Sequence, residues 1–90
     1  MAHPSRMCAT VTGTYKIHVN NDYLHIDRSH HLILAGSRAL DDELDRRGWQ
    51  DWMARGRFTL CGPYRSSPLQ WDVHDQVDLT SVKSVQFVRR

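Results

Sequence analysis

The stretch KIHVNNDYLHID, residues 16–27, alternates apolar and polar side chains on either side of an Asn-Asp pair. Alternation with a period of two is typical of a β-strand with one buried face, and two turn-forming residues between two such runs predict a hairpin. We therefore place the loop at residues 21–22. The apolar residues that this register collects on one face are Ile17, Val19, Leu24 and Ile26. A slip by one residue would mix apolar and polar side chains on both faces, so the pattern favours this register.

The first strand of the hairpin extends back along the chain, and a third strand is predicted after the hairpin. Residues 8–19 are rich in β-branched and aromatic side chains and are interrupted by Gly13, which predicts one long strand with a bend or bulge at the glycine. Residues 31–35, HLILA, are a short apolar run before a glycine, so we expect a third strand that is buried on both faces. Residues 1–7 lack such a pattern and are predicted to be a flexible arm, followed by a single domain over residues 8–90.

A helix is predicted over residues 38–54. Ser37 is a suitable N-cap, and acidic residues come early and arginines late, which is the charge order that complements a helix dipole. Leucines and tryptophans at four-residue intervals form one apolar stripe, which continues to Trp52 and Met53. Gly48 interrupts the stripe and indicates either a close approach of the helix to the sheet or a break into two shorter helices.

After the helix the period of two returns, which predicts further strands. Residues 57–61 form the first of them, and residues 69–73 alternate in the same way. The segment 77–88 is predicted to contain a tight turn near residues 79–82 and a last strand centred on Val85 and Phe87.

The predicted order is therefore β-β-β-α-β-β with a final strand, which places the chain in the α+β class. We expect a small antiparallel sheet, barrel-like or rolled, with the amphipathic helix packed on it. Three strands, a helix and more strands is also the order of an oligonucleotide-binding (OB) barrel, so the fold is expected to be OB-like. A closed or rolled sheet would protect the edge strands of so small a protein.

Composition sets limits on function and location. The 90 residues carry 12 basic and 10 acidic side chains, and the formal net charge of +2 does not by itself indicate a polyanionic partner. The distribution is more informative, because the first 45 residues hold four Lys/Arg against six Asp/Glu and the last 45 hold eight against four. This asymmetry favours a basic face built from the C-terminal half.

No segment resembles a signal peptide or a membrane span, so a cytoplasmic protein without membrane contact is expected. In a reducing compartment, Cys8 and Cys61 are expected to be buried free thiols rather than a disulfide.

Basic and aromatic residues that could share a surface predict a non-catalytic binding module for single-stranded or structured nucleic acid. Arginine and lysine contact phosphates while aromatic rings stack on bases. The candidate residues for this surface are Arg55, Arg57, Tyr64, Arg65, Lys83 and Tyr23. The polar face of the hairpin is predicted to form a second such platform from Tyr15, Tyr23, His18 and His25.

A small regulator or inhibitor that binds another protein is the alternative. Interfaces favour Trp, Met, Tyr and Arg, and the predicted helix ends with Trp49, Trp52 and Met53. A homodimer formed through the helix or through an unpaired strand belongs to the same class.

A metal site or a small enzyme is the second alternative. In the predicted register His18 faces His25 across the hairpin, so the two imidazoles could bind one ion, with His30 or Asp27 as a third ligand. Neither cysteine belongs to a zinc-binding motif, and the chain contains no phosphate loop, HExxH sequence or nucleophile elbow. The sequence therefore predicts no cofactor and no catalytic residue.

Overall fold

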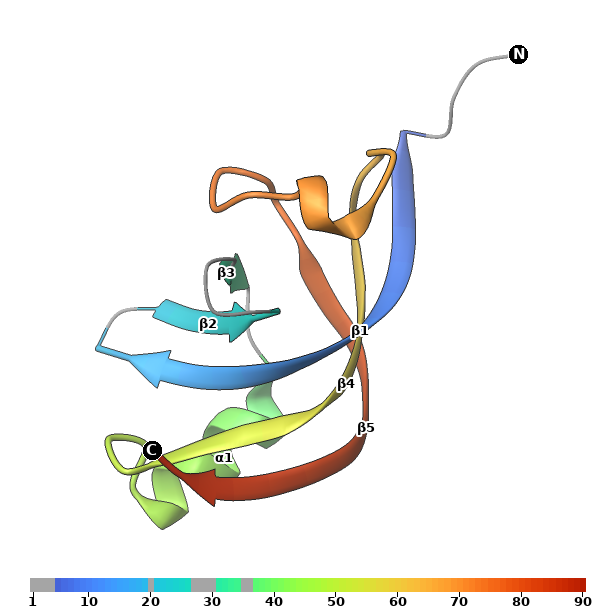
Figure 1. The fold of residues 1–90 in the computed structure, drawn as a ribbon. Coiled ribbons are helices and arrows are strands. Elements are labelled where there is room, and N and C mark those ends of the chain that lie inside the picture. The colour runs from blue at the N-terminus through green and yellow to red at the C-terminus, as the bar shows by residue number, and fades with distance from the viewer. Residues whose placement is uncertain (1–4, 20, 27–30, 35–36) are drawn as a thin grey trace.

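The computed structural model describes residues 5–19, 21–26, 31–34 and 37–90. Within them, five antiparallel strands form one sheet in the order β3-β2-β1-β4-β5 (Figure 1). The strands are β1 (Arg6–His18), β2 (Asn21–His25), β3 (His31–Leu34), β4 (Trp52–Pro63) and β5 (Asp78–Arg89). Helix α1 (Arg38–Arg47) follows β3, and a short 3-10 helix, η1 (Pro68–Gln70), lies between β4 and β5. The predicted α+β class with an antiparallel sheet and a helix is confirmed.

The sheet is strongly bent but open. The long strands β1, β4 and β5 change direction near their middle (Figure 1). In the described part of the chain β3 and β5 are the two edges and do not pair with each other, so no closed barrel is formed. The predicted strand over residues 69–73 is wrong, because η1 and irregular backbone occupy that segment. The predicted turn near residues 79–82 is also wrong, since β5 continues through it with an irregular register against β4.

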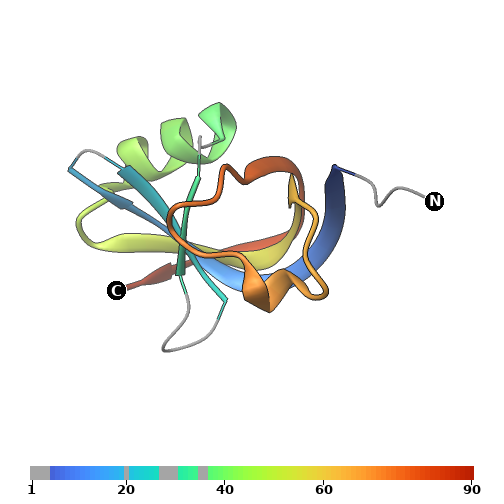
Figure 2. The same ribbon diagram turned by 90° about the horizontal axis from the view of Figure 1, so that it is seen from above.

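The inner face of the sheet holds the core. Tyr15, Leu24 and Phe58 are fully buried on this face. Leu40 and Leu44 of α1 pack against one end of it, and residues 64–77 cover the other end (Figures 1 and 2). In that second segment Trp71 and Val77 are buried, and the indole N–H of Trp71 donates to the carbonyl of Pro63 at 2.7 Å. The alternation in residues 69–73 therefore reflects burial of Trp71 in a covering segment, not a strand.

The hairpin forms with a different register from the predicted one. Tyr15 faces Leu24 and His18 faces Asn21, so residues 21–22 belong to β2 and do not form the loop. Val19, which we predicted to be buried, is 82% exposed. The physical reason is that sliding a strand by an even number of residues leaves every side chain on its original face. Alternation therefore predicted the two faces correctly and could not select among registers that share them.

The helix is shorter than predicted and ends at Gly48. Its N-cap is Ser37, as expected, and the side-chain oxygen of Ser37 accepts from the amide of Leu40 at 3.4 Å. Gly48 has φ of +103°, a conformation that disfavours any residue with a Cβ, and its amide donates to the carbonyl of Leu44. A Cβ at Gly48 would meet nothing within 4 Å, so the glycine does not mark a close approach to the sheet. The helix does stop at Gly48, but β4 follows it instead of the second helix that a break would give. Trp52 and Met53 begin β4 instead of continuing the helical stripe.

The two cysteines are joined, contrary to the expectation of free thiols. Cys8 and Cys61 are direct partners in the β1–β4 register, and their sulfurs form a disulfide with a Cα–Cα distance of 4.0 Å. They lie on the outer face of the sheet and not in the core. The sequence separation of 53 residues hid this pairing, because only the alignment of β1 with β4 brings the thiols together.

The start of the domain also differs from the predicted boundary. Strand β1 begins at Arg6, so Arg6 and Met7 of the predicted arm belong to the sheet. The Arg6 guanidinium pairs with Asp78 of β5 at 3.2 Å. Residues 1–4 of the predicted arm lie outside the described residues.

Candidate nucleic-acid interface

The outer face of the sheet gathers basic residues from four strands. Thr14 of β1 faces His25 of β2 on one side and Arg55 of β4 on the other. One row further along, Thr12 faces Arg57, which in turn faces Lys83 of β5. Side chains that face each other across strands point to the same side of a sheet. The outer face therefore carries Lys16, His18, His25, Arg55, Arg57 and Lys83.

This surface contains no acid at the strand positions that surround the cations. From Met53 to Thr59 of β4, the outward positions and their partners in β1, β2 and β5 are basic, neutral polar or apolar. Among the described residues, Lys16, Arg55, Arg57 and Lys83 make no ion pair. Uncompensated charges on one face produce a positive field that favours an anionic partner.

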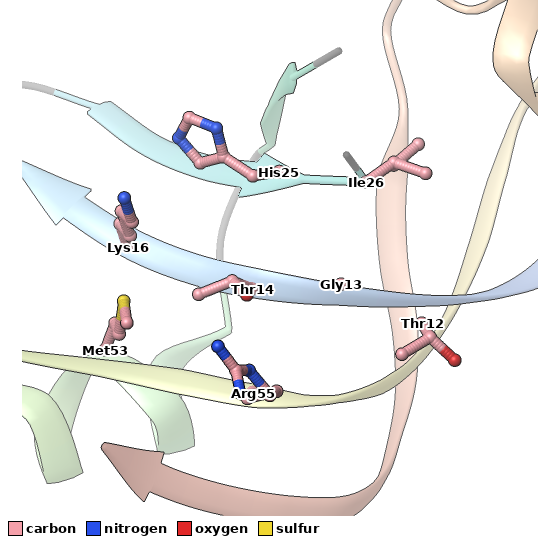
Figure 3. Close-up of a pocket in the computed structure, with 8 residues that line it drawn as sticks. All are labelled: Thr12, Gly13, Thr14, Lys16, His25, Ile26, Met53 and Arg55. Atoms are coloured by element: carbon pink, nitrogen blue, oxygen red, sulfur yellow. The ribbon is translucent and has the colours of Figure 1, made fainter. Parts of the chain in front are cut away.

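A cavity of about 530 Å³ opens on this face (Figure 3). Its lining combines basic, hydroxyl and apolar groups, and the residues are Thr12, Gly13, Thr14, Lys16, His25, Ile26, Met53 and Arg55. Gly13 permits the close approach of β2, because a Cβ there would lie 2.8 Å from the carbonyl oxygen of His25. The end of β2 therefore comes down beside the middle of β1 and forms one wall.

An aromatic pair lies beside Lys16, one of the residues that line the cavity. Tyr23 is the direct partner of Lys16, and its ring packs edge-on against His18 with 4.8 Å between ring centroids. Both rings belong to the predicted polar face of the hairpin. The prediction that Tyr15 belongs to this platform is wrong, because its side chain is fully buried on the inner face.

Two of the predicted binding residues lie elsewhere. Tyr64 and Arg65 follow the far end of β4, and Pro63 is six positions, or about 20 Å of strand, from Arg57. The Arg65 guanidinium pairs with the carboxylate of Asp75 at 2.9 Å and also donates to the carbonyl of Tyr64. The fold thus brings together Arg55, Arg57, Lys83 and Tyr23 and leaves Tyr64 and Arg65 apart from them.

The residues predicted for a protein interface separate as well. Trp49 lies in the turn after α1 and is half-buried against the core. Trp52 lies between two guanidinium groups, those of Arg47 at 5.4 Å and Arg89 at 5.2 Å from its ring centroid. Met53 points to the outer face and lines the cavity. These three side chains do not form a common surface.

The geometry assumed for a metal site is absent. In the observed register His18 and His25 are offset by four residues along the paired strands, or about 13 Å, instead of facing each other. Among the described residues no group of three metal-binding side chains occurs. His30 and Asp27, the predicted third ligands, lie outside the described residues.

An acidic cluster joins the helix to the hairpin on the inner face. The Tyr15 hydroxyl donates to Asp41 of α1 at 2.7 Å and accepts from the amide of Ser37 at 3.2 Å. Burial, against the lowering effect of the Tyr15 hydrogen bond and together with the neighbouring carboxyl of Asp22, raises the pKa of Asp41 to about 6. Burial likewise raises the pKa of the Tyr15 hydroxyl. This cluster keeps its carboxyls away from the outer face.

Lys16 and the threonines of β1 were missed from the sequence. Alternation could have identified Lys16, because it points to the same side of β1 as His18, which we predicted to lie on the polar face of the hairpin.

Comparisons with protein-family models, with curated proteins and with solved structures find no match to this chain. The helices of the described part of the chain are too short or too polar to cross a lipid bilayer.

Proposed function

We propose that this protein binds a single strand of nucleic acid on the outer face of its sheet. The observation that carries the proposal is the set of four cations, Lys16, Arg55, Arg57 and Lys83, on a surface whose surrounding strand positions carry no carboxylate. Regularly spaced phosphates can replace the missing carboxylates and release counterions as they bind.

The aromatic pair favours a single strand over a duplex. Base stacking on a side chain needs an unpaired base, and Tyr23 beside Lys16 supplies a ring next to a cation. An OB-like fold, with the sheet open between β3 and β5, belongs to this proposal. In such barrels the outer surface of strands 2 and 3 binds oligonucleotides, and here the outer side of β2 carries Tyr23 and His25.

Arginine substitution with salt titration tests the proposal. We expect the double variant Arg57→Ala/Lys83→Ala to weaken binding of a labelled single strand about tenfold and to reduce the salt slope by about 0.7 for each lost contact. Arg38→Ala is the matched control, because Arg38 is an exposed cation on α1 with only a distant carboxylate partner at 4.0 Å. Fluorescence anisotropy at several salt concentrations measures both quantities. Equal affinity of the double variant and the control variant would rule out the outer face.

The compartment remains a prediction. We expect cytoplasmic location from the sequence, but the Cys8–Cys61 disulfide bears against it, because such cross-links persist chiefly in oxidising compartments. Mass spectrometry of alkylated protein isolated from cells without reductant distinguishes the two states of the cysteines.

A further inference from the structure

The cavity on the outer face has its polar groups arranged around one residue. Thr14 lies at the centre, with His25 directly across on β2 and Arg55 directly across on β4. Lys16 is the next outward residue along β1, which makes it a diagonal neighbour of His25. Diagonal positions lie about 7–8 Å apart, within reach of long side chains. Figure 3 shows the Lys16 ammonium and the Arg55 guanidinium on two sides of Thr14, with the His25 ring on a third.

The charge of this cavity matches a dianion. Lys16 and Arg55 are two permanent cations, and no carboxylate is among the lining residues. Thr12 and Thr14 add hydroxyl donors. An internal phosphodiester of a nucleic acid carries one negative charge, whereas a terminal phosphomonoester carries nearly two at neutral pH and accepts several charge-assisted hydrogen bonds.

The apolar part of the lining favours a phosphate that is attached to something larger. Ile26 and Met53 line the cavity beside the basic groups. The volume of about 530 Å³ is far more than one phosphate fills and lies in the range of cavities that hold small organic ligands. A terminal nucleotide has the required composition, with a charged phosphate and a flat, largely apolar base.

We propose that this cavity receives the terminal phosphate of the bound strand, so that the protein prefers strands with a phosphorylated end. The inference rests on the proposed function, since it assigns one end of the same strand to the cavity. Arg57 and Lys83 then contact internal phosphates, because neither lines the cavity. Lys16 and Arg55 hold the end.

Strands that differ only at their ends test this inference. Three oligonucleotides of one sequence carry a 5′-phosphate, a 3′-phosphate or hydroxyls at both ends, and each competes with a labelled strand in fluorescence anisotropy. We expect one phosphorylated strand to bind about tenfold more tightly than the hydroxyl strand. Lys16→Gln and Arg55→Gln should each remove most of that preference. Arg57→Gln, the matched control on the same face, should weaken all three strands equally and preserve the ratio.

The outcomes separate the two proposals. Equal affinity for all three strands, or a ratio that Lys16→Gln and Arg55→Gln leave intact, overturns the terminal-phosphate site while the proposed function stands. Absence of binding for every strand overturns the proposed function itself. A nucleoside monophosphate titrated alone by calorimetry provides the last arm. If it binds as tightly as the phosphorylated strand, the ligand is a free nucleotide and the strand-end assignment is wrong.

Discussion

The cations of the outer sheet face and the arginines elsewhere in the fold differ in their partners. On the outer face the four cations Lys16, Arg55, Arg57 and Lys83 have no carboxylate partner among the described residues. Five other arginines have carboxylate partners, and the pairs are Arg6 with Asp78 at the far end of the same face, Arg38 with Asp42, Arg46 and Arg47 with Glu43, and Arg65 with Asp75. The contrast teaches that the modest net charge of the chain conceals a local surplus, because these carboxylates neutralise other cations than the four of the outer face.

The largest expected effect is a difference in the free energy of unfolding between substitutions at two neighbouring positions of β4, one on each face of the sheet. Phe58 is fully buried on the inner face, so Phe58→Ala should lower the free energy of unfolding by about 3–5 kcal/mol. Arg57 points outward, and Arg57→Ala should change it by less than about 0.5 kcal/mol. Urea denaturation followed by tryptophan fluorescence measures both. A large loss of stability for Arg57→Ala would mean that the outer face, and not only the inner face, stabilises the fold.

Loss of the disulfide should have the next largest effect. Cys8→Ser/Cys61→Ser removes the cross-link between residues 53 apart, and we expect a loss of about 2–4 kcal/mol, since the unfolded chain gains conformational freedom. Thermal melting of the wild type with and without reductant gives the same comparison. The double variant is the control, because its melting temperature should not respond to reductant. An unchanged wild-type melting temperature after full reduction would contradict the expected stabilisation.

Carboxylates introduced on the outer face should neutralise its surplus of positive charge. Gln86 faces Arg55 and Thr12 faces Arg57, so Gln86→Glu/Thr12→Glu places an acid opposite each cation. We expect nucleic-acid binding to weaken by about tenfold or more, because the new carboxylates repel phosphates and neutralise the arginines. Thr12→Gln is the uncharged control and should bind nearly as well as the wild type. Fluorescence anisotropy measures the affinity of both variants for the labelled strand. Unaltered binding by the double variant would show that the strand binds elsewhere on the protein.

The smallest effect concerns the acidic cluster of the inner face. Asp41 has a pKa of about 6 in the folded protein against an ordinary 3.8, so the folded state holds the proton more tightly than the unfolded chain. Its stabilising contribution is complete below about pH 4 and disappears as the pH rises through about 6. Asp41→Asn should therefore increase stability above pH 6 by about 1 kcal/mol, a figure reduced for solvent screening.

Denaturation at several pH values tests the sign of that effect. The wild type should lose stability between pH 4 and 7 relative to Asp41→Asn, while Asp42→Asn, on an exposed part of the same helix, should follow the wild type. A variant that is less stable than the wild type at pH 8 would show that the ionised carboxylate of Asp41 stabilises the fold.

Several features were predictable because they depend on neighbours in sequence. The division of the hairpin into apolar and polar faces, the N-cap at Ser37 and the inward placement of Phe58 and Leu60 follow from local periodicity and capping. The candidate grouping of Arg55, Arg57 and Lys83 came from the excess of basic residues in the C-terminal half. Arg57 and Lys83 are direct partners in the sheet, which no local pattern specifies.

By itself, the sequence determined how apolar and polar side chains divide between the faces of the hairpin strands, because alternation along an extended chain is a local property. Only the tertiary structure decided the remaining features. The hairpin register shifted so that Tyr15 pairs with Leu24, and the Tyr15 hydroxyl donates to Asp41. The alignment of β1 with β4 joined Cys8 to Cys61 and placed Arg55 beside Thr14. The pairings between β1 and β4 connect residues about 40 to 50 positions apart, and their free energy comes from burial and from contacts between strands, which no short window of the chain contains.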